Sequence, residues 1–149
     1  MDLDYVRGIF ELHNSSGAAF PDLLARDYLH PGAEFVQFAA APGAATHRGR
    51  DEVAALFRDR FEAGAMLIEE LELTAVDEHR ALAAFRIRMR GARSGVETSM
   101  RLWNLLTFEG RRIVRIEEFS DEEDALAATR ADRPNPASKP PGSRRPGPS

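Results

Sequence analysis

Cysteine is absent from this chain of 149 residues, lysine occurs once, and no long apolar run is present. Without cysteine, the chain cannot form a disulfide scaffold, a thiol nucleophile or a thiolate metal site. A membrane-spanning helix needs about 18 or more consecutive apolar residues, which this sequence lacks. The opening stretch MDLDYVRGIF carries acidic residues where a secretion signal has basic ones, so we expect a cytoplasmic protein.

Several motifs of catalytic and cofactor sites are also missing. The sequence contains no GxGxxG and no P-loop, the two common signatures of nucleotide binding. Its four histidines, His13, His30, His47 and His79, show no metal-ligand spacing. In the stretch GARSG the serine stands fourth instead of third, so this is not the nucleophile elbow of acyl-transfer enzymes. We therefore expect neither a cofactor nor a metal.

The charge is divided unevenly along the chain. Residues 1–129 hold 15 basic against 23 acidic residues, whereas residues 130–149 hold five basic residues and one acidic residue. Binding to nucleic acid depends on basic side chains that displace counterions from phosphate, so we expect no nucleic-acid partner for the acidic body. The last 20 residues are rich in proline, glycine and serine and have no large apolar residue, which predicts a disordered tail. One domain, 1–129, is expected before it.

Helical periodicity dominates the first half of the chain. A helix is expected over 3–14, where an apolar stripe includes His13, and a short helix is expected near 18–25. A third amphipathic helix is predicted to begin with Asp51 as its N-cap and to end at Gly64.

The second half of the chain follows the two-residue period of strands. One strand is expected earlier, within 33–40, and four more are predicted at 66–76, 80–90, 97–108 and 112–119. Helices followed by a strand meander indicate an α+β domain with helices packed on one face of an antiparallel sheet.

One predicted strand separates charged from apolar side chains. Arg86, Arg88 and Arg90 share one face, and the residues between them are apolar. Such a row could bind an anionic partner. We interpret it instead as a solvated face whose arginines pair with carboxylates of neighbouring strands.

The last predicted strand carries a carboxylate in line with aliphatic side chains. Val114, Ile116 and Glu118 fall on one face by the two-residue period. In an apolar cavity, desolvation raises the pKa of a carboxylic acid and suits it to proton transfer near neutral pH. The opposite face of the strand is equally mixed, so two interpretations stay open. Glu118 either works in a pocket or is a charge near the strand end that reaches solvent.

Three segments, HRGRDEVAALF, GARSGVE and GRRIVRIEEFSDEEDALAA, resemble the SnoaL-like polyketide cyclase family of the nuclear-transport-factor-2-like superfamily. The resemblance spans residues 6–128. It implies a cone-shaped α+β fold in which a curved antiparallel sheet wraps around the N-terminal helices and encloses an apolar pocket for a hydrophobic small molecule. It also implies a homodimer, which we expect to cover apolar positions such as Leu102 or Leu106 on the convex face of the sheet.

The resemblance also implies site residues. The catalytic acid/base of these cyclases, an aspartate, falls on Glu118, whose longer side chain displaces the carboxylate by about one methylene. Gln37 stands where related ketosteroid isomerases have a base, and glutamine cannot take that proton. We therefore expect Gln37 or Asn104 to donate a hydrogen bond to a developing enolate. The expected ligand-binding residues are Tyr28, Phe35, Trp103, Val114 and Ile116, although core packing explains Tyr28 and Trp103 equally well.

Two functions follow from these residues. The first is a cofactor-independent cyclase or isomerase that transfers protons on a hydrophobic, polyketide-like carbonyl compound. The second is a non-catalytic ligand-binding or dimerisation module, because a fold does not determine a function.

Overall fold

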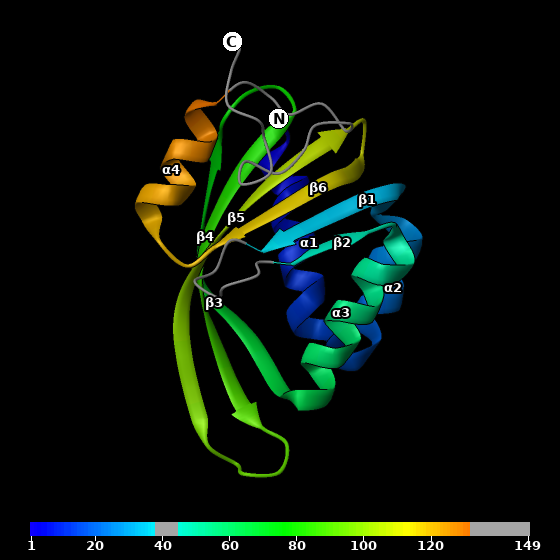
Figure 1. Cartoon of the computed structure of the whole chain (residues 1–149), viewed down its shortest axis with the longest axis vertical. Helices are drawn as coiled ribbons and strands as arrows, with labels where there is room; N and C mark the ends of the chain where they lie inside the picture. Colours follow the sequence, from blue (N-terminus) through cyan, green and yellow to red (C-terminus); the bar gives the residue numbers. More distant parts are fainter. Residues whose placement is uncertain (38–44, 132–149) are drawn as a thin grey trace.

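The computed structural model describes residues 1–37 and 45–131 and is shown in Figure 1. Three helices precede most of the strands, and a fourth ends the described part of the chain. They are α1 (Leu3–Ser16), α2 (Phe20–Asp27), α3 (Arg50–Ala63) and α4 (Glu122–Arg130), with a short 3-10 helix, η1 (Gly17–Ala19), between the first two. Within the described ranges, no helix is long and apolar enough to cross a membrane.

Six strands form a single curved sheet in the order β2-β1-β6-β5-β4-β3. The strands are β1 (Leu29–Gln37), β2 (Thr46–Arg48), β3 (Gly64–Ala75), β4 (Arg80–Gly91), β5 (Glu97–Glu109) and β6 (Arg112–Phe119). The expected α+β fold is confirmed, but the sheet is mixed because β1 runs parallel to β6. Periodicity along the chain reports single strands and hairpins, and it does not report which distant strand completes the sheet.

The helices cover the two faces of the sheet unequally, as Figure 1 shows. The larger hydrophobic core lies between the concave face and α1 to α3, and it contains Val6, Leu24, Phe35 and Val53 at 2% exposure or less. On the opposite face, α4 covers a smaller cluster around Leu82, Leu105, Phe119 and Ala125. The concave face is therefore the side on which the helices can enclose a cavity.

The later strands lie within two residues of their predicted bounds, whereas β1 differs. The predicted strand begins at residue 33, but β1 begins at Leu29, so Pro31 and Gly32 lie within it. Pairing of β1 with β6 shifts between Leu29 and Glu34, so the strand is irregular there. Such an irregularity accommodates proline, which has no backbone N–H for a regular ladder. The last residues of the predicted strand, 38–40, lie outside the described residues.

The start of α3 also differs from the prediction. Its N-cap is Gly49, with φ of 89°, and Asp51 lies inside the first turn. The Glu52 carboxylate accepts a hydrogen bond from the Arg48 backbone N–H at 2.8 Å. A carboxylate that reaches back in this way satisfies a donor near the helix start, so an aspartate cap is not needed.

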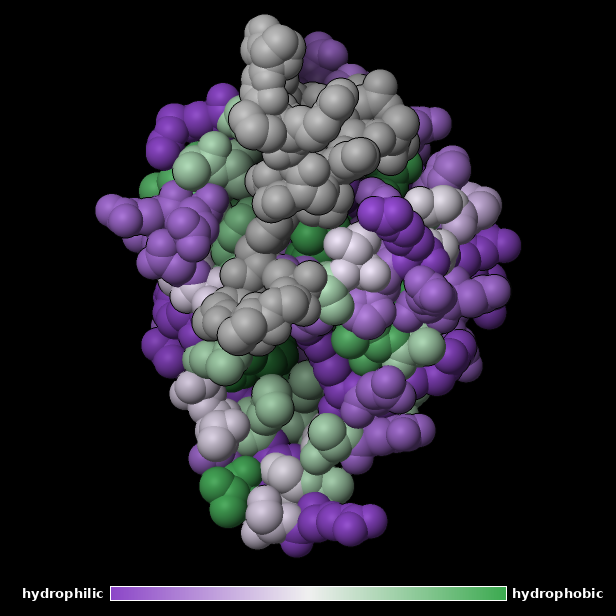
Figure 2. All heavy atoms as spheres, in the orientation of Figure 1, coloured by the Kyte–Doolittle hydropathy of each residue, from purple (hydrophilic) through white to green (hydrophobic). Residues whose placement is uncertain are grey.

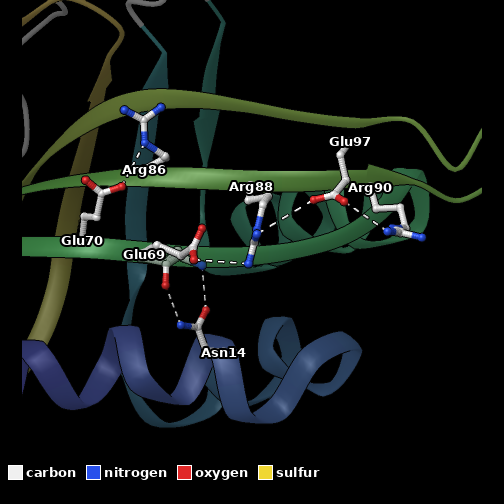
Figure 3. A network of polar contacts seen from close by, with 8 residues as sticks. Asn14, Glu69, Glu70, Arg86, Arg88, Arg90 and Glu97 are labelled. Carbon is white, nitrogen blue, oxygen red and sulfur yellow. Dashed lines mark hydrogen bonds and ion pairs between the residues drawn. The ribbon is translucent and has the colours of Figure 1, made fainter.

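The arginine row of β4 lies on the convex face and is paired with carboxylates, as expected. Figure 3 shows Arg86 against Glu70 and Arg88 against Glu69, at 3.1 and 3.2 Å. Arg90 lies 3.1 Å from Glu97 of the next strand. The row is therefore a partly solvated face in which positive and negative charges alternate.

The predicted tail, 130–149, lies outside the described residues except for its first two positions. Arg130 ends α4. The guanidinium of Arg80 donates to the carbonyls of Ala128 and Thr129 at 3.5 and 3.3 Å, which holds the carboxyl end of α4 against the sheet.

Candidate functional site

A cavity of about 380 Å³ lies between the concave face of the sheet and helices α1 to α3. A volume of this size is typical of sites for small molecules. In the space-filling view of Figure 2, hydrophobic side chains reach the surface between hydrophilic flanks in the lower half of the molecule. The apolar lining comes from helices and strands alike and includes Ile9, Phe20, Leu24, Phe57, Phe85, Ile87, Leu102 and Leu106.

Three polar side chains of the lining form one row across three neighbouring strands. Glu118 of β6 is the register partner of Gln37 on β1 and of Asn104 on β5. All three line the cavity. Neighbouring strands lie about 4.8 Å apart, so a ligand that reaches Glu118 also comes within reach of the other two side chains. The structure thus brings together the three residues that the sequence proposes for catalysis.

Glu118 is buried and ion-paired with Arg60 of α3. Its side chain is 5% exposed, and its two carboxylate oxygens accept hydrogen bonds from the two terminal guanidinium nitrogens at 2.8 and 3.1 Å. The guanidinium also lies over the rings of Phe35 and Phe57, with its carbon 5.2 and 5.8 Å from their centroids. Glu118 is therefore not a solvated edge charge, and both of its oxygens already have a fixed donor.

Asn104 has an unsatisfied oxygen in the same wall. The residue is 8% exposed, and its Oδ1 has no hydrogen-bond partner within the described part of the chain. A buried amide oxygen without a donor costs free energy, on the order of 1–3 kcal/mol. A ligand that donates a hydrogen bond here would remove that cost.

A bulge changes which aliphatic side chains of β6 face the cavity. Ile116 lines it beside Glu118, but the second aliphatic residue is Ile113, and Val114 is not part of the lining. The pairing with β5 passes from Thr107 opposite Arg115 to Phe108 opposite Ile113, so one residue of β6 is extra. The expectation for Val114 is therefore wrong, because a bulge reverses the alternation of faces at this point.

The other expected wall residues lie elsewhere. Phe35 is fully buried in the core beneath Arg60, and Tyr28 packs against Tyr5 with ring centroids 5.8 Å apart. Trp103 lies on the opposite face, in the cluster beneath α4. None of the three is part of the cavity lining. For Tyr28 and Trp103, core packing is the interpretation that fits.

Two polar residues of the lining, Arg60 and His13, are absent from the sequence prediction. Arg60 is 58 residues from Glu118 along the chain, and no local pattern reports such a pair. His13 does carry a signal, because it lies in the apolar stripe of α1 and is 4% exposed. Burial lowers the pKa of His13, and its hydrogen bond with Asn14 opposes that shift only in part.

A second buried carboxylate, Glu117, lies on the opposite face of β6. Burial raises its pKa, while Arg115, with its Nε 3.5 Å from a Glu117 oxygen, acts in the opposite direction. Glu117 is not part of the cavity lining, so it is not a candidate for the site. Among the described residues, no group of three or more histidine, aspartate or glutamate side chains could hold a metal ion.

Comparison with known families identifies the chain. The model of the SnoaL-like domain matches residues 8–116, so the chain belongs to the SnoaL-like family. No curated protein matches it in sequence.

Solved structures with the same fold are distant in sequence. A nuclear-transport-factor-2-like protein of unknown function from Burkholderia pseudomallei is 20% identical, with a TM-score of 0.64 over 87% of this chain and 97% of that one. A candidate polyketide cyclase from Xanthomonas campestris is 13% identical, with a TM-score of 0.64 over 85% and 95%. A candidate isomerase from Bacillus subtilis is 12% identical, with a TM-score of 0.65 over 84% and 91%. At these identities, the likeness establishes the fold alone.

Proposed function

We propose that this SnoaL-like protein catalyses a cofactor-independent proton transfer on a hydrophobic, polyketide-like ring ketone, as a cyclase or an isomerase. The observation that carries the proposal is the row of Gln37, Glu118 and Asn104 in the wall of an otherwise apolar cavity. The related folds described as a cyclase and an isomerase support this reaction class without establishing it.

The ion pair assigns a direction to the proton transfer. Both oxygens of Glu118 accept hydrogen bonds from the guanidinium of Arg60, so the group is oriented as an acceptor, and in this proposal it acts as a base. It takes a proton from the carbon next to the ketone, and the electrons of that C–H bond move to the carbonyl oxygen to form an enolate. A carboxylate has about four lone-pair sites, so two bonds to Arg60 leave room for this proton.

The neighbouring groups stabilise the enolate. The amide groups of Asn104 and Gln37 can donate hydrogen bonds to the developing oxyanion, and Arg60 supplies a positive charge in a site with a largely apolar lining. In an isomerisation the enolate is reprotonated at a different carbon. In an aldol-type cyclisation its carbon attacks a second carbonyl, and the alkoxide takes the proton from Glu118.

Exchange of carbon-bound hydrogen for deuterium tests the proposal without knowledge of the natural substrate. The probe is α-tetralone, a bicyclic ketone, followed in D₂O by proton NMR with and without the protein. We expect the protein to accelerate loss of the α-proton signal, and Glu118→Gln to reduce that acceleration by about 100-fold or more. Glu109→Gln, at the exposed end of β5, is the matched control. Equal exchange with Glu118→Gln and wild-type protein would remove Glu118 from the chemistry.

A second candidate function is a non-catalytic module that binds the same class of ligand. It is favoured by one observation, which is that Arg60 engages both oxygens of Glu118 and so resembles a structural ion pair. Under this function the wild-type protein binds α-tetralone but leaves its rate of deuterium exchange unchanged.

A further inference from the structure

The side chain of Asn14 is held in one orientation by the edge strand of the sheet. Its Nδ2 donates to the backbone carbonyl of Ile68 at 2.7 Å, and its Oδ1 accepts from the Ile68 backbone N–H at 2.9 Å. Figure 3 shows this pair of bonds between the last turn of α1 and β3. A reversed amide would place donor against donor and acceptor against acceptor. The Asn14 oxygen is therefore an acceptor at a fixed position.

This oxygen determines where the proton of His13 lies. The distance from His13 Nδ1 to Asn14 Oδ1 is 3.1 Å, and a carbonyl oxygen can only accept. Nδ1 must therefore carry the hydrogen. In the neutral imidazole the other nitrogen, Nε2, then has a free lone pair and acts as an acceptor. Burial lowers the pKa of His13, which favours this neutral form at pH 7.

The surroundings of the ring leave Nε2 to the cavity. His13 lines the cavity, and its ring packs against Phe20 and Phe61, each with a centroid distance of 5.1 Å. Among the described residues, no group forms a hydrogen bond with Nε2, and this nitrogen is not one of the fully enclosed polar atoms. The charged groups of the same lining are Arg60 and Glu118, which already bind each other.

We propose that His13 Nε2 accepts a hydrogen bond from a hydroxyl group of the ligand, so that the cavity selects hydroxylated ring compounds. A phenol or an enol fits this requirement, because it joins an apolar ring to one strong donor. Asn104 makes a weaker selection, because an amide carries both an acceptor oxygen and donor hydrogens and can bind either a hydroxyl group or an ether oxygen. The inference rests on the proposed function only in placing the ligand in this cavity, and it requires no catalysis.

A matched pair of probes tests the inference. 2-Naphthol and 2-methoxynaphthalene differ only in the hydroxyl hydrogen, which the methyl group replaces. We expect the wild-type protein to bind 2-naphthol about tenfold more tightly by calorimetry at pH 7.5. His13→Phe keeps an aromatic ring but has no acceptor, so it should abolish the preference. His79→Phe, in an exposed turn, is the matched control and should keep it.

A folding check and a pH dependence complete the test. If His13→Phe does not fold by circular dichroism, the wild-type preference is measured as the pH is lowered from 7.5 until His13 is protonated, as followed by NMR of its ring protons. Protonation converts Nε2 into a donor and should reduce the preference. Equal affinity for the two probes, no binding of either at millimolar concentration, or a preference that survives both His13→Phe and low pH would overturn the inference. If the protein accelerates α-proton exchange on ring ketones but binds 2-naphthol no more tightly than 2-methoxynaphthalene, the inference is overturned and the proposed function stands.

Discussion

At the scale of single residues, the pair of Arg60 and Glu118 connects the helical layer to the sheet. Arg60 belongs to α3 and Glu118 to β6, and the guanidinium side chain is 26% exposed against 5% for the carboxylate. A buried carboxylate depends on its partner far more than a surface one does. The pair therefore contributes both to the proposed chemistry and to the position of α3.

Loss of the arginine alone should leave an uncompensated buried charge. We expect Arg60→Met to lower the free energy of unfolding by about 2 kcal/mol, somewhat less than for a fully buried pair because the arginine is partly solvated. Glu118→Gln in the Arg60→Met background should recover part of that loss. Urea denaturation of the two single variants and the double variant measures the coupling. Additive losses would show that the two residues do not stabilise each other.

The buried histidine should make stability depend on pH. Burial lowers the pKa of His13 in the folded state, so the unfolded chain binds its proton first as the pH falls. The contribution of neutral His13 is fully present above the ordinary value of 6.5, and it is lost as the pH falls from 6.5 through the folded-state pKa. The difference in unfolding free energy between wild type and His13→Gln should therefore shift against the wild type between pH 7.5 and 5. A difference that stays constant across this range would contradict the assignment.

At the scale of elements, β3 pairs with β4 on one side, and on its outer side, where no strand follows, a side chain of α1 contacts its backbone. Asn14 satisfies both backbone groups of Ile68, which an unpaired edge would otherwise present to solvent or to another chain. This pair of bonds also fixes how α1 crosses the sheet beside the cavity.

Removal of the Asn14 amide should loosen that contact. Asn14→Ala loses the two hydrogen bonds with Ile68 and the one with His13, so we expect a decrease of about 2–3 kcal/mol in the free energy of unfolding. The backbone amide of Ile68 should also exchange faster with solvent, which amide hydrogen exchange by NMR measures. Ser15→Ala, on the exposed side of the same turn, is the control. Unchanged protection at Ile68 would mean that the strand does not depend on Asn14.

The elements themselves were largely predictable from the sequence. Strands β3 to β6 alternate apolar and polar residues between turn signals such as Glu109-Gly110, so their bounds follow from local rules. Asp51 was misassigned as the cap of α3 because Gly49 and Glu52 together replace an aspartate cap. Val114 was misassigned because one extra residue in β6 reverses the alternation, and a bulge leaves no clear mark in the composition.

At the scale of the whole molecule, the pairings that build the site were beyond prediction from single residues. The row of Gln37, Glu118 and Asn104 exists because β1 and β5 flank β6 in one sheet, which is a contact between distant segments. The position of Glu118 came from a family resemblance and agrees with the cavity lining. Arg60, which pairs with Glu118, could not be predicted, since α3 meets β6 only in the folded chain.

A homodimer stays a prediction, but Leu102 and Leu106 do not require one. Leu102 and Leu106 line the cavity on the concave face, so a partner chain is not needed to cover them. Large apolar side chains that do reach the surface include Leu67, Val96 and Leu126, at 37 to 59% exposure. Sedimentation equilibrium at micromolar concentration should give twice the chain mass of 16.5 kDa. A mass of one chain would contradict the prediction.

The most direct test of the account measures binding and proton exchange together for Glu118→Gln. Because glutamine keeps the shape of the side chain but cannot take a proton, the account predicts that the exchange rate of α-tetralone falls by about 100-fold or more. The dissociation constant of α-tetralone should change by less than about threefold, because the apolar lining supplies most of the affinity. Two results would contradict the claim that the Glu118 carboxylate is the base of a catalytic cavity. One is an exchange rate that is the same for Glu118→Gln and the wild-type protein, and the other is no acceleration of exchange by the wild-type protein.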